Sequence, residues 1–587
     1  MENIKGIAAS PGVAIGPAVL YKPAVLDVQH GKFPPSETDA ELLRLKTAYE
    51  KSRADLDALE KQIKETLGPD YARVIDAHKT ILEDPNFKNS IKSKIQKEHL
   101  VAESAVLLAL QEISITFDNL TDEFFKERKN DVSDVAKRLI TNLTGGARYA
   151  MEKAAGPSVL VAHNLLPSDT LNLKDNNFIA FVTDIGGKTS HSAILAQSME
   201  IPAVVGSSVS SKTIKAGDML IVDGESGAVI VNPDAETLAK YRKIQREIKR
   251  SELLLKTIND LPFLTTDGKH VTMMINYDPR LDSKETKKLK TEGLGLLRTE
   301  FLFLDRALPP SEEEQFNIYA ATAKKFDMRP VHIRLADLGG DKVHSLNLGE
   351  YKEELNPFMG LRGVRILLKY PAIMQTQLRA IIRAAAAAPA PVKLIVPMIS
   401  SLEEVRAVKA VFNDTLRALA AQGVTPKNKI DFGIMVEVPS AAFALDSMLP
   451  EVDFVSIGTN DLIQYMIAVD RMNQDVAVLY DPYHPGFIRI INHIVQTCAQ
   501  KGKSVSICGE LASDPEIVPL LIGLGVHTLS TSPRMFLRIK NKLRSVSYDA
   551  CANLAQAALL MDSSAEIKNL SLSLTTPEGE KTLNENP

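Results

Sequence analysis

One histidine of this chain stands between a glycine turn and the start of a predicted helix. The stretch 186–196 reads GGKTSHSAILA and contains His191, and it follows an apolar run at 178–183 that predicts a strand. Thr189 and Ser190 are residue types that cap helix N-termini. Free backbone N–H groups and the positive end of the helix dipole favour an anion at such a place. His191 is therefore a candidate phosphoryl acceptor, and the plainer alternative is a capped helix whose histidine faces solvent.

Polar residues also gather where five predicted strands of the C-terminal half end. These strand ends are Arg298-Thr299-Glu300, Arg334 with 337–341, Glu437-Val438-Pro439, 458–461 and Cys508-Gly509-Glu510. A single charged strand end is usually a structural ion pair. Five ends in register are more than stability alone explains, and they predict one site at the carboxyl ends of the strands.

The residue types of this cluster suit phosphoryl chemistry. Glu437 and Asp461 offer the hard carboxylate oxygens that Mg²⁺ prefers, with water and substrate phosphate completing its shell. Arg298, Arg334 and Arg471 offer planar forks for phosphate or carboxylate, although each one alone could equally form a structural salt bridge. Phosphoryl transfer needs positioning and charge neutralisation, and this set supplies both.

Cys508 is the last residue of one of these predicted strands, and its role has two interpretations. A free cysteine is most often a small buried hydrophobe. At the end of a barrel strand, its thiol could instead donate a proton to the substrate.

The bulk composition narrows the class of protein. The chain has 587 residues, of which 45% are hydrophobic and 24% charged, with a net charge of -4. No basic face suggests a nucleic-acid partner. Three cysteines, without paired metal-ligand spacing, predict no disulfide framework and a reducing cytoplasm. The N-terminus has no signal-peptide core, and no apolar run is long enough to insert into a membrane.

The predicted secondary structure changes from strands to helices and back to strands along the first 233 residues. Short strands are expected at 3–21, amphipathic helices from 35 to 144, and further strands at 158–162, 178–183, 202–205, 219–223 and 229–231. This order predicts a discontinuous α/β domain (1–34 and 145–233) with an inserted helical bundle (35–144). A charged helical linker is expected at 234–261.

Eight apolar strand-like runs then alternate with helical segments such as 374–388 and 401–419. The runs lie at 271–276, 295–298, 331–335, 393–398, 432–437, 454–457, 504–508 and 527–530. Eight alternating units in about 300 residues predict a (β/α)8 TIM barrel at 262–562. Residues 563–587 are expected to form a loosely ordered polar tail.

Several long motifs together resemble Enzyme I of the bacterial phosphotransferase system. They are GIAASPG at 6–12, GGKTSHSAILA at 186–196, GLLRTEFLF at 295–303, DLGGDK at 337–342, NPFMG at 356–360, GIMVEVP at 433–439, SIGTNDL at 456–462 and CGEL at 508–511. The similarity runs from about residue 3 to 560. It implies a swivelling phosphohistidine α/β domain with the helical insertion, followed by the barrel.

The resemblance also implies a function and its residues. In that family phosphoenolpyruvate phosphorylates a histidine, here His191, which passes the phosphoryl group to the carrier protein HPr as the first general step of sugar uptake. Pyruvate is released, and the resemblance makes Cys508 the acid that protonates the enolate carbon. The helical insertion would dock HPr, and the barrel would form a homodimer. Phosphoenolpyruvate would be held by Arg298, Arg334, Asn460, Asp461 and Arg471, with Arg362 a less certain addition, and Mg²⁺ by Glu437 and Asp461.

Three positions depart from the family pattern. Gln197 and Lys188 stand where arginines are usual, and Leu166 stands where a threonine is expected. These departures bear on how the phosphohistidine is held.

Two other functions fit parts of the pattern. A pyruvate, phosphate dikinase or phosphoenolpyruvate synthase shares the phosphohistidine and barrel domains but needs a nucleotide domain, for which the helical first 145 residues leave no room. A non-catalytic regulator that senses phosphoenolpyruvate would keep the fold, but the intact His191, Glu437, Asp461 and Cys508 argue against it.

Overall fold

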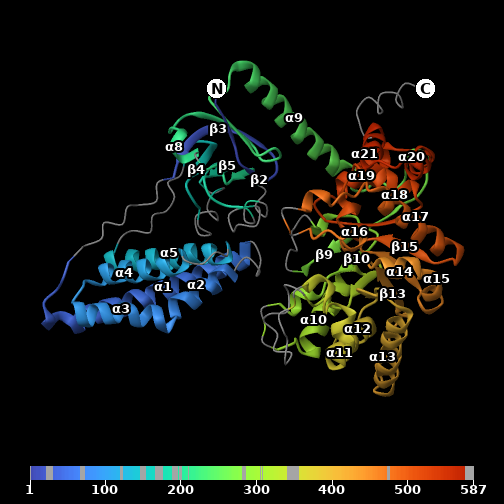
Figure 1. Ribbon diagram of the computed structural model, residues 1–587, viewed down its shortest axis with the longest axis horizontal. Coiled ribbons are helices and arrows are strands. Elements are labelled where there is room, and N and C mark those ends of the chain that lie inside the picture. Colours follow the sequence, from blue (N-terminus) through green and yellow to red (C-terminus); the bar gives the residue numbers. More distant parts are fainter. Residues whose placement is uncertain are drawn as a thin grey trace. The chain divides into compact units, whose positions relative to one another are not determined.

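A computed structural model of the chain divides into two compact units, Met1–Glu252 and Leu253–Pro587 (Figure 1). Each unit is described by itself. The described residues are 2–21, 31–66, 73–118, 123–145, 154–165, 173, 176–187, 193, 196, 201–208, 210–279, 286–304, 306, 308–339, 354, 356–471, 473 and 476–574.

The first unit contains a mixed sheet of eight strands in the order β1-β8-β7-β3-β4-β5-β6-β2. The strands are β1 (Glu2–Lys5), β2 (Ile7–Ser10), β3 (Val13–Leu20), β4 (Ser158–Ala162), β5 (Phe178–Thr183), β6 (Ala203–Val205), β7 (Met219–Asp223) and β8 (Ala228–Val231). Alternate residues of β4 enter two different cores. Leu160 and Ala162 pack on one face, and Val159 and Val161 on the other. A strand buried on both faces reads as a continuous apolar run, which is why the sequence revealed it.

Five helices lie between β3 and β4 in the chain and have a core of their own. They are α1 (Thr38–Thr66), α2 (Arg73–Glu83), α3 (Pro85–Glu98), α4 (Ala102–Asp118) and α5 (Glu123–Thr144). Leu56, Ile91, Ala105 and Leu139 are fully buried in that core. Because β3 and β4 pair in parallel, the sheet continues across the helical segment. The predicted α/β fold with a helical insertion is confirmed.

Two further helices follow, the short α8 (Ser210–Thr213) in the first unit and the long α9 (Ala235–Thr257), which continues past the boundary between the units. Asp234 begins α9 by accepting a hydrogen bond from the Thr237 amide at 2.8 Å. Beyond the helix, the buried Lys540 of the barrel donates to the carbonyl of Asn259 at 2.7 Å. This bond lies within the second unit, of which the residues just after α9 are part.

The second unit is a closed barrel of eight parallel strands, as the sequence predicted. The strands are β9 (Thr272–Tyr277), β10 (Leu294–Leu297), β11 (Val331–Arg334), β12 (Val392–Val396), β13 (Asp431–Val436), β14 (Phe454–Ile457), β15 (Ser504–Ile507) and β16 (Thr528–Thr531). β16 pairs with β9 and closes the ring. Each strand overlaps one of the eight apolar runs.

Helices surround these strands (Figure 1). They are α10 (Glu312–Phe326), α11 (Val364–Lys369), α12 (Pro371–Ala387), α13 (Leu402–Ala421), α14 (Pro439–Phe443), α15 (Leu445–Met448), α16 (Thr459–Ile467), α17 (Pro485–Gln500), α18 (Val518–Gly523), α19 (Phe536–Ser545) and α20 (Tyr548–Leu560). Ser311 with Glu314, and Ser401 with Glu404, form capping boxes that fix where α10 and α13 begin. Within the described part of the chain, no helix is long and apolar enough to cross a membrane.

The expectation of a polar tail at 563–587 is wrong for its first part. Residues Ser564–Ser573 form helix α21, which begins where Ser563 accepts a hydrogen bond from the Glu566 amide. Ile567 is fully buried, and the Ser571 hydroxyl donates to the Glu516 carbonyl at 2.6 Å. Leu570 and Leu574 also pack against the barrel core, so three apolar side chains and one cap order a segment whose composition is mostly polar. Residues 575–587 lie outside the described residues.

The barrel interior contains a buried histidine whose titration should make stability depend on pH. Burial, and then the charge of Lys393, lower the pKa of His332 to about 3. An unfolded histidine titrates near 6.5, so the unfolded chain takes up the proton first and stability falls as pH drops below that value. We expect the unfolding free energy of the barrel to fall by about 2 kcal/mol between pH 7 and pH 5 through this residue.

The measurement is urea unfolding of the native chain and of the His332→Leu variant at both pH values. The variant should lose less stability on acidification by that amount. An identical loss in both proteins would contradict the assignment.

Candidate active site

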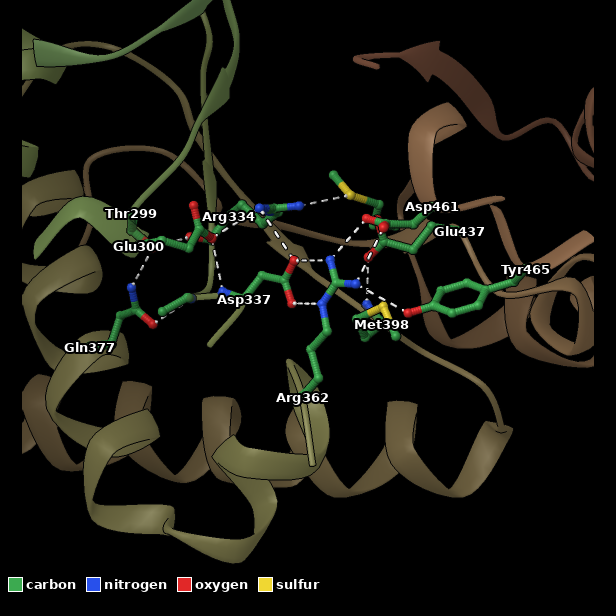
Figure 2. Close-up of polar contacts among 12 residues, drawn as sticks. Thr299, Glu300, Arg334, Asp337, Arg362, Gln377, Met398, Glu437, Asp461 and Tyr465 are labelled. Carbon is green, nitrogen blue, oxygen red and sulfur yellow. Dashed lines mark hydrogen bonds and ion pairs between the residues drawn. The ribbon is translucent and has the colours of Figure 1, made fainter. Parts of the chain in front are cut away.

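Arg334 belongs to a buried network of charged groups at the carboxyl ends of the barrel strands (Figure 2). It is the last residue of β11, and its Nη2 donates to Glu300 Oε1 at 2.9 Å. Nη1 lies 3.4 Å from the sulfur of Met435, and Nε is buried without a hydrogen-bond partner. Burial opposes the charge, but Glu300 and Asp337 outweigh it and raise the pKa of Arg334 above its ordinary value. A cation with an unused buried N–H is prepared for an anionic ligand.

Arg362 joins two carboxylates at the centre of the network (Figure 2). Its Nε and Nη2 donate to Asp337 at 3.0 and 2.8 Å, and its Nη1 and Nη2 donate to Asp461 at 3.2 and 3.0 Å. Tyr465 accepts a further hydrogen bond from Nη1 at 3.1 Å. The guanidinium is buried, and its fork geometry suits both carboxylates. Arg362 therefore fixes the distance between the ends of β11 and β14.

Glycine makes this approach possible. Gly339 has φ +135, and a Cβ there would lie 2.6 Å from the Cα of Arg362. Any side chain at this position would push the Arg362 loop away from the end of β11. The glycine thus explains how two loops distant in sequence lie against each other.

Glu437 follows β13 and is almost fully buried. Its Oε1 accepts a hydrogen bond from the Met398 amide at 2.7 Å, and Met398 adopts a left-handed conformation with φ 58. Burial, and then the negative charge of Asp461, raise the pKa of Glu437 to about 8. Two carboxylates so close together repel each other unless a proton or a cation neutralises them.

Asp461 lies in the first turn of α16, directly after β14. Arg471 Nη2 is 3.5 Å from Asp461 Oδ1, and Arg471 Nη1 is buried without a hydrogen-bond partner. Next to Asp461, Asn460 accepts a hydrogen bond from the Glu510 amide at 3.0 Å. This bond ties the end of β14 to the end of β15.

The two carboxylates fit a divalent cation. Glu437 and Asp461 are hard oxygen donors, and because burial and then the charge of Asp461 raise the pKa of Glu437, this carboxylate favours a proton or a cation beside it. Among the described residues, no three His, Cys, Asp or Glu side chains are grouped to hold a metal. An ion here would take two protein ligands and fill its shell with water and substrate oxygens, as Mg²⁺ commonly does.

Cys508 follows β15 and points into the barrel beside Leu296, Ile395 and Met435. Its sulfur accepts a hydrogen bond from the Ser456 hydroxyl at 3.2 Å. Burial raises the pKa of Cys508, and the nearby arginines only partly oppose this effect. The sequence left open whether nearby cations or burial would have the larger effect on the pKa of Cys508. Burial has the larger effect, so the thiol keeps its proton at neutral pH and is able to act as an acid.

The structure brings together most of the residues that the sequence singled out. Those at the barrel end are Arg334, Glu437, Asn460, Asp461, Arg471 and Cys508. Arg298 follows β10 with an exposed side chain, and its charge acts on Cys508. His191, together with Gln197, Leu166 and Lys188, lies outside the described residues. The neighbours Ala193 and Ala196 are helical and fully buried in the α/β core.

Sequence reasoning underestimated part of the network. It treated Arg362 as a less certain ligand and gave no role to Glu300 or to the Met398 amide. A signal for Arg362 existed in the flanking Gly360 and Gly363, but nothing in the sequence indicated that the backbone amide of Met398, just beyond β12, would hold Glu437.

Comparison with known proteins gives the class first. Three family models of PEP-utilising enzymes match: the N-terminal domain at residues 5–128, the mobile domain at 155–227 and the PEP-binding domain at 253–548. The buried arginines and carboxylates described above all lie within the last of these. The fold and the site therefore define a PEP-utilising enzyme.

Full-length relatives then give the family. The chain is 40% identical to the phosphoenolpyruvate-protein phosphotransferase of Geobacillus stearothermophilus, covering 96% of this chain and 97% of the relative. It is 39% identical to that of Bacillus sp. (strain S), with coverage of 96% and 97%, and 38% identical to that of Priestia megaterium, with coverage of 96% and 98%. The chain belongs to the phosphoenolpyruvate-protein phosphotransferase family, and the resemblance to Enzyme I is confirmed.

The bridge made by Arg362 should be a major source of barrel stability. Arg362→Met would leave Asp337 and Asp461 buried without their shared cation, and breaking such a pair costs about 3–5 kcal/mol. Urea unfolding monitored by circular dichroism measures the change. Arg365→Met is the matched control, because Arg365 is partly exposed and donates to two backbone carbonyls of the same loop. Its cost should stay near 1 kcal/mol, and equal losses in the two variants would contradict the bridging role.

Proposed function

We propose that this chain transfers the phosphoryl group of phosphoenolpyruvate to His191 and then to the phosphocarrier protein HPr, releasing pyruvate. The reaction is the first general step of sugar uptake by the phosphotransferase system. The observation that carries the proposal is a pair of arginines with buried N–H groups that have no hydrogen-bond partner, Nε of the buried Arg334 and Nη1 of the partly exposed Arg471, at the strand ends that also hold Glu437 and Asp461.

Phosphoenolpyruvate carries a phosphate and a carboxylate, and both need cationic partners. Arg334 and Arg471 offer their unpartnered N–H groups, and Arg298 offers an exposed guanidinium at the end of β10. Asn460 and Asp461 complete the set at the start of α16. Charged hydrogen bonds are strong where water is excluded, so this arrangement positions the phosphoryl group and offsets its charge.

Glu437 and Asp461 would hold Mg²⁺, which when bound supplies positive charge to the phosphate and enolate oxygens. The protein's own contribution is to keep both carboxylates in place. The Met398 amide fixes Glu437, and Arg362 fixes Asp461. Neither carboxylate needs to reorganise when the ion and the substrate arrive.

Cys508 would complete the reaction after the phosphoryl group leaves. The remaining enolate needs a proton on its carbon, and the buried thiol is protonated at neutral pH because burial raises its pKa. The thiol lies at the same strand ends as Arg334. A general acid held there accelerates the step by about 10²–10⁴-fold.

The partner roles follow the domains predicted from sequence. Residues 35–144 would dock HPr, and the barrel at 262–562 would bind phosphoenolpyruvate and form a homodimer. Phe443, Val478 and Leu479 are 66%, 83% and 60% exposed on the barrel, and apolar groups of this kind suit burial against a second copy. We place the protein in the cytoplasm, in keeping with its three free cysteines.

The decisive experiment supplies ³²P-labelled phosphoenolpyruvate to the native chain and to His191→Ala, with and without Mg²⁺ and ATP. The native chain should gain an acid-labile phosphohistidine that requires Mg²⁺ but not ATP, and mass mapping should place it on His191. The variant should stay unlabelled with an unchanged melting temperature. Label on His191→Ala would contradict the assignment, and a requirement for ATP would favour a dikinase-like reaction.

Replacing the acid should separate the two half-reactions. Cys508→Ala is expected to slow pyruvate formation by about 10²–10⁴-fold, while phosphoryl exchange between phospho-HPr and His191 stays near normal because it involves no proton transfer to carbon. A lactate dehydrogenase assay for pyruvate and a label-exchange assay measure the two rates. If both rates fall together with the melting temperature, the cysteine is only a packing residue.

A further inference from the structure

A serine hydroxyl lies against the sulfur of Cys508 inside the barrel. Ser456 is the third residue of β14 and is fully buried. Its Oγ donates a hydrogen bond to Cys508 Sγ at 3.2 Å, and the same sulfur lies 3.7 Å from the carbonyl oxygen of Ile457. The thiol therefore has a donor on one side and an acceptor on the other, which restricts the orientations of its proton.

The backbone of Cys508 is held by other groups. Its amide donates to the Ile457 carbonyl at 3.3 Å, and its carbonyl accepts a hydrogen bond from Asn276 Nδ2 at 3.0 Å. Asn276 is itself fixed by the Ser530 hydroxyl at 2.7 Å, and Ser530 fits only because Gly295 opposite has no side chain. Since these bonds hold the chain at Cys508, the Ser456 hydroxyl is not needed to keep the loop in place. Its contact is with the reacting atom.

We propose that Ser456 is a positioning residue for the acid step, a role that rests on the function proposed above. In that step the S–H bond of Cys508 breaks, and its electron pair remains on sulfur as a thiolate. The π electrons of the enolate form the new C–H bond, and the enolate oxygen becomes the carbonyl oxygen of pyruvate. The thiolate then takes a proton from water. Negative charge thus develops on Sγ in a buried place, where the Ser456 O–H is the donor that stabilises it.

The size of the effect of Ser456 on the rate depends on the negative charge that develops on the sulfur. A hydrogen bond to a neutral thiol is weak, but a hydrogen bond to a buried anion contributes considerably more. The Ser456 hydroxyl therefore stabilises the transition state more than the ground state, which is the condition for accelerating a chemical step. Substrate binding should hardly depend on it.

A neighbouring serine provides a matched control. Ser506 on β15 pairs in register with Ser456 and is also buried. Its hydroxyl donates to the Val455 carbonyl at 3.4 Å. Ser506→Ala thus deletes the same group at the same level of the barrel without touching the sulfur.

The experiment measures pyruvate formation by the full chain with phosphoenolpyruvate, Mg²⁺ and HPr. Ser456→Ala should lower kcat by about 10- to 100-fold with KM unchanged, and should enlarge the solvent deuterium isotope effect because proton transfer becomes more rate-limiting. Phosphoryl exchange between phospho-HPr and the chain should remain normal. Ser506→Ala should match the native chain in every measurement. If Ser456→Ala does not fold, Ser456→Cys, which is slightly larger and keeps a weaker donor, should show the same changes to a lesser degree.

Two results would overturn the inference. One is a normal kcat and isotope effect in Ser456→Ala while Cys508→Ala is slow, which would leave the proposed function intact. The other is an equal fall of both half-reactions in Ser456→Ala and Ser506→Ala, which would mean that both serines only support packing. Failure of the native chain to form pyruvate from phosphoenolpyruvate would instead contradict the proposed function itself.

Discussion

The barrel site depends on one buried cation shared by two carboxylates. Arg362 is held by Asp337 beside β11 and by Asp461 at the start of α16, so it links strand ends that are far apart in the sequence. Burying three charges is costly unless each is paired with good geometry. The pairing here is bidentate on both sides. The network thereby places Asp461 beside Glu437 before any ligand binds.

That arrangement leaves charge that the protein does not neutralise by itself. Burial, and then the charge of Asp461, raise the pKa of Glu437 on one side of the site, whereas Arg334 and Arg471 carry N–H groups without partners on the other. In the function proposed above, a divalent cation and a substrate with an anionic phosphate and a carboxylate would complement these two halves. The site is thus organised for its ligands, and the protein alone leaves it electrostatically incomplete.

Cys508 illustrates how environment decides what a residue does. Next to arginines a thiol tends to ionise, and in an apolar barrel it tends to stay protonated. The barrel interior prevails, and in the proposed acid step Ser456 supplies a hydrogen bond that favours the thiolate once it forms. The same burial that makes the group an acid also makes its conjugate base costly. A hydroxyl beside the sulfur offsets part of that cost.

The sequence by itself determined the eight barrel strands, the helical insertion and the residue types of the site, because buried parallel strands read as apolar runs and the site residues follow them directly. It did not determine helix α21, where a few apolar side chains packed on the barrel and one cap order a mostly polar segment. Nor did it determine the role of Arg362, because a guanidinium between two carboxylates depends on a loop approach that Gly339 permits and no local pattern encodes. The tertiary structure also decided the protonation of Cys508, since burial and nearby charge oppose each other and only their geometry shows which one prevails.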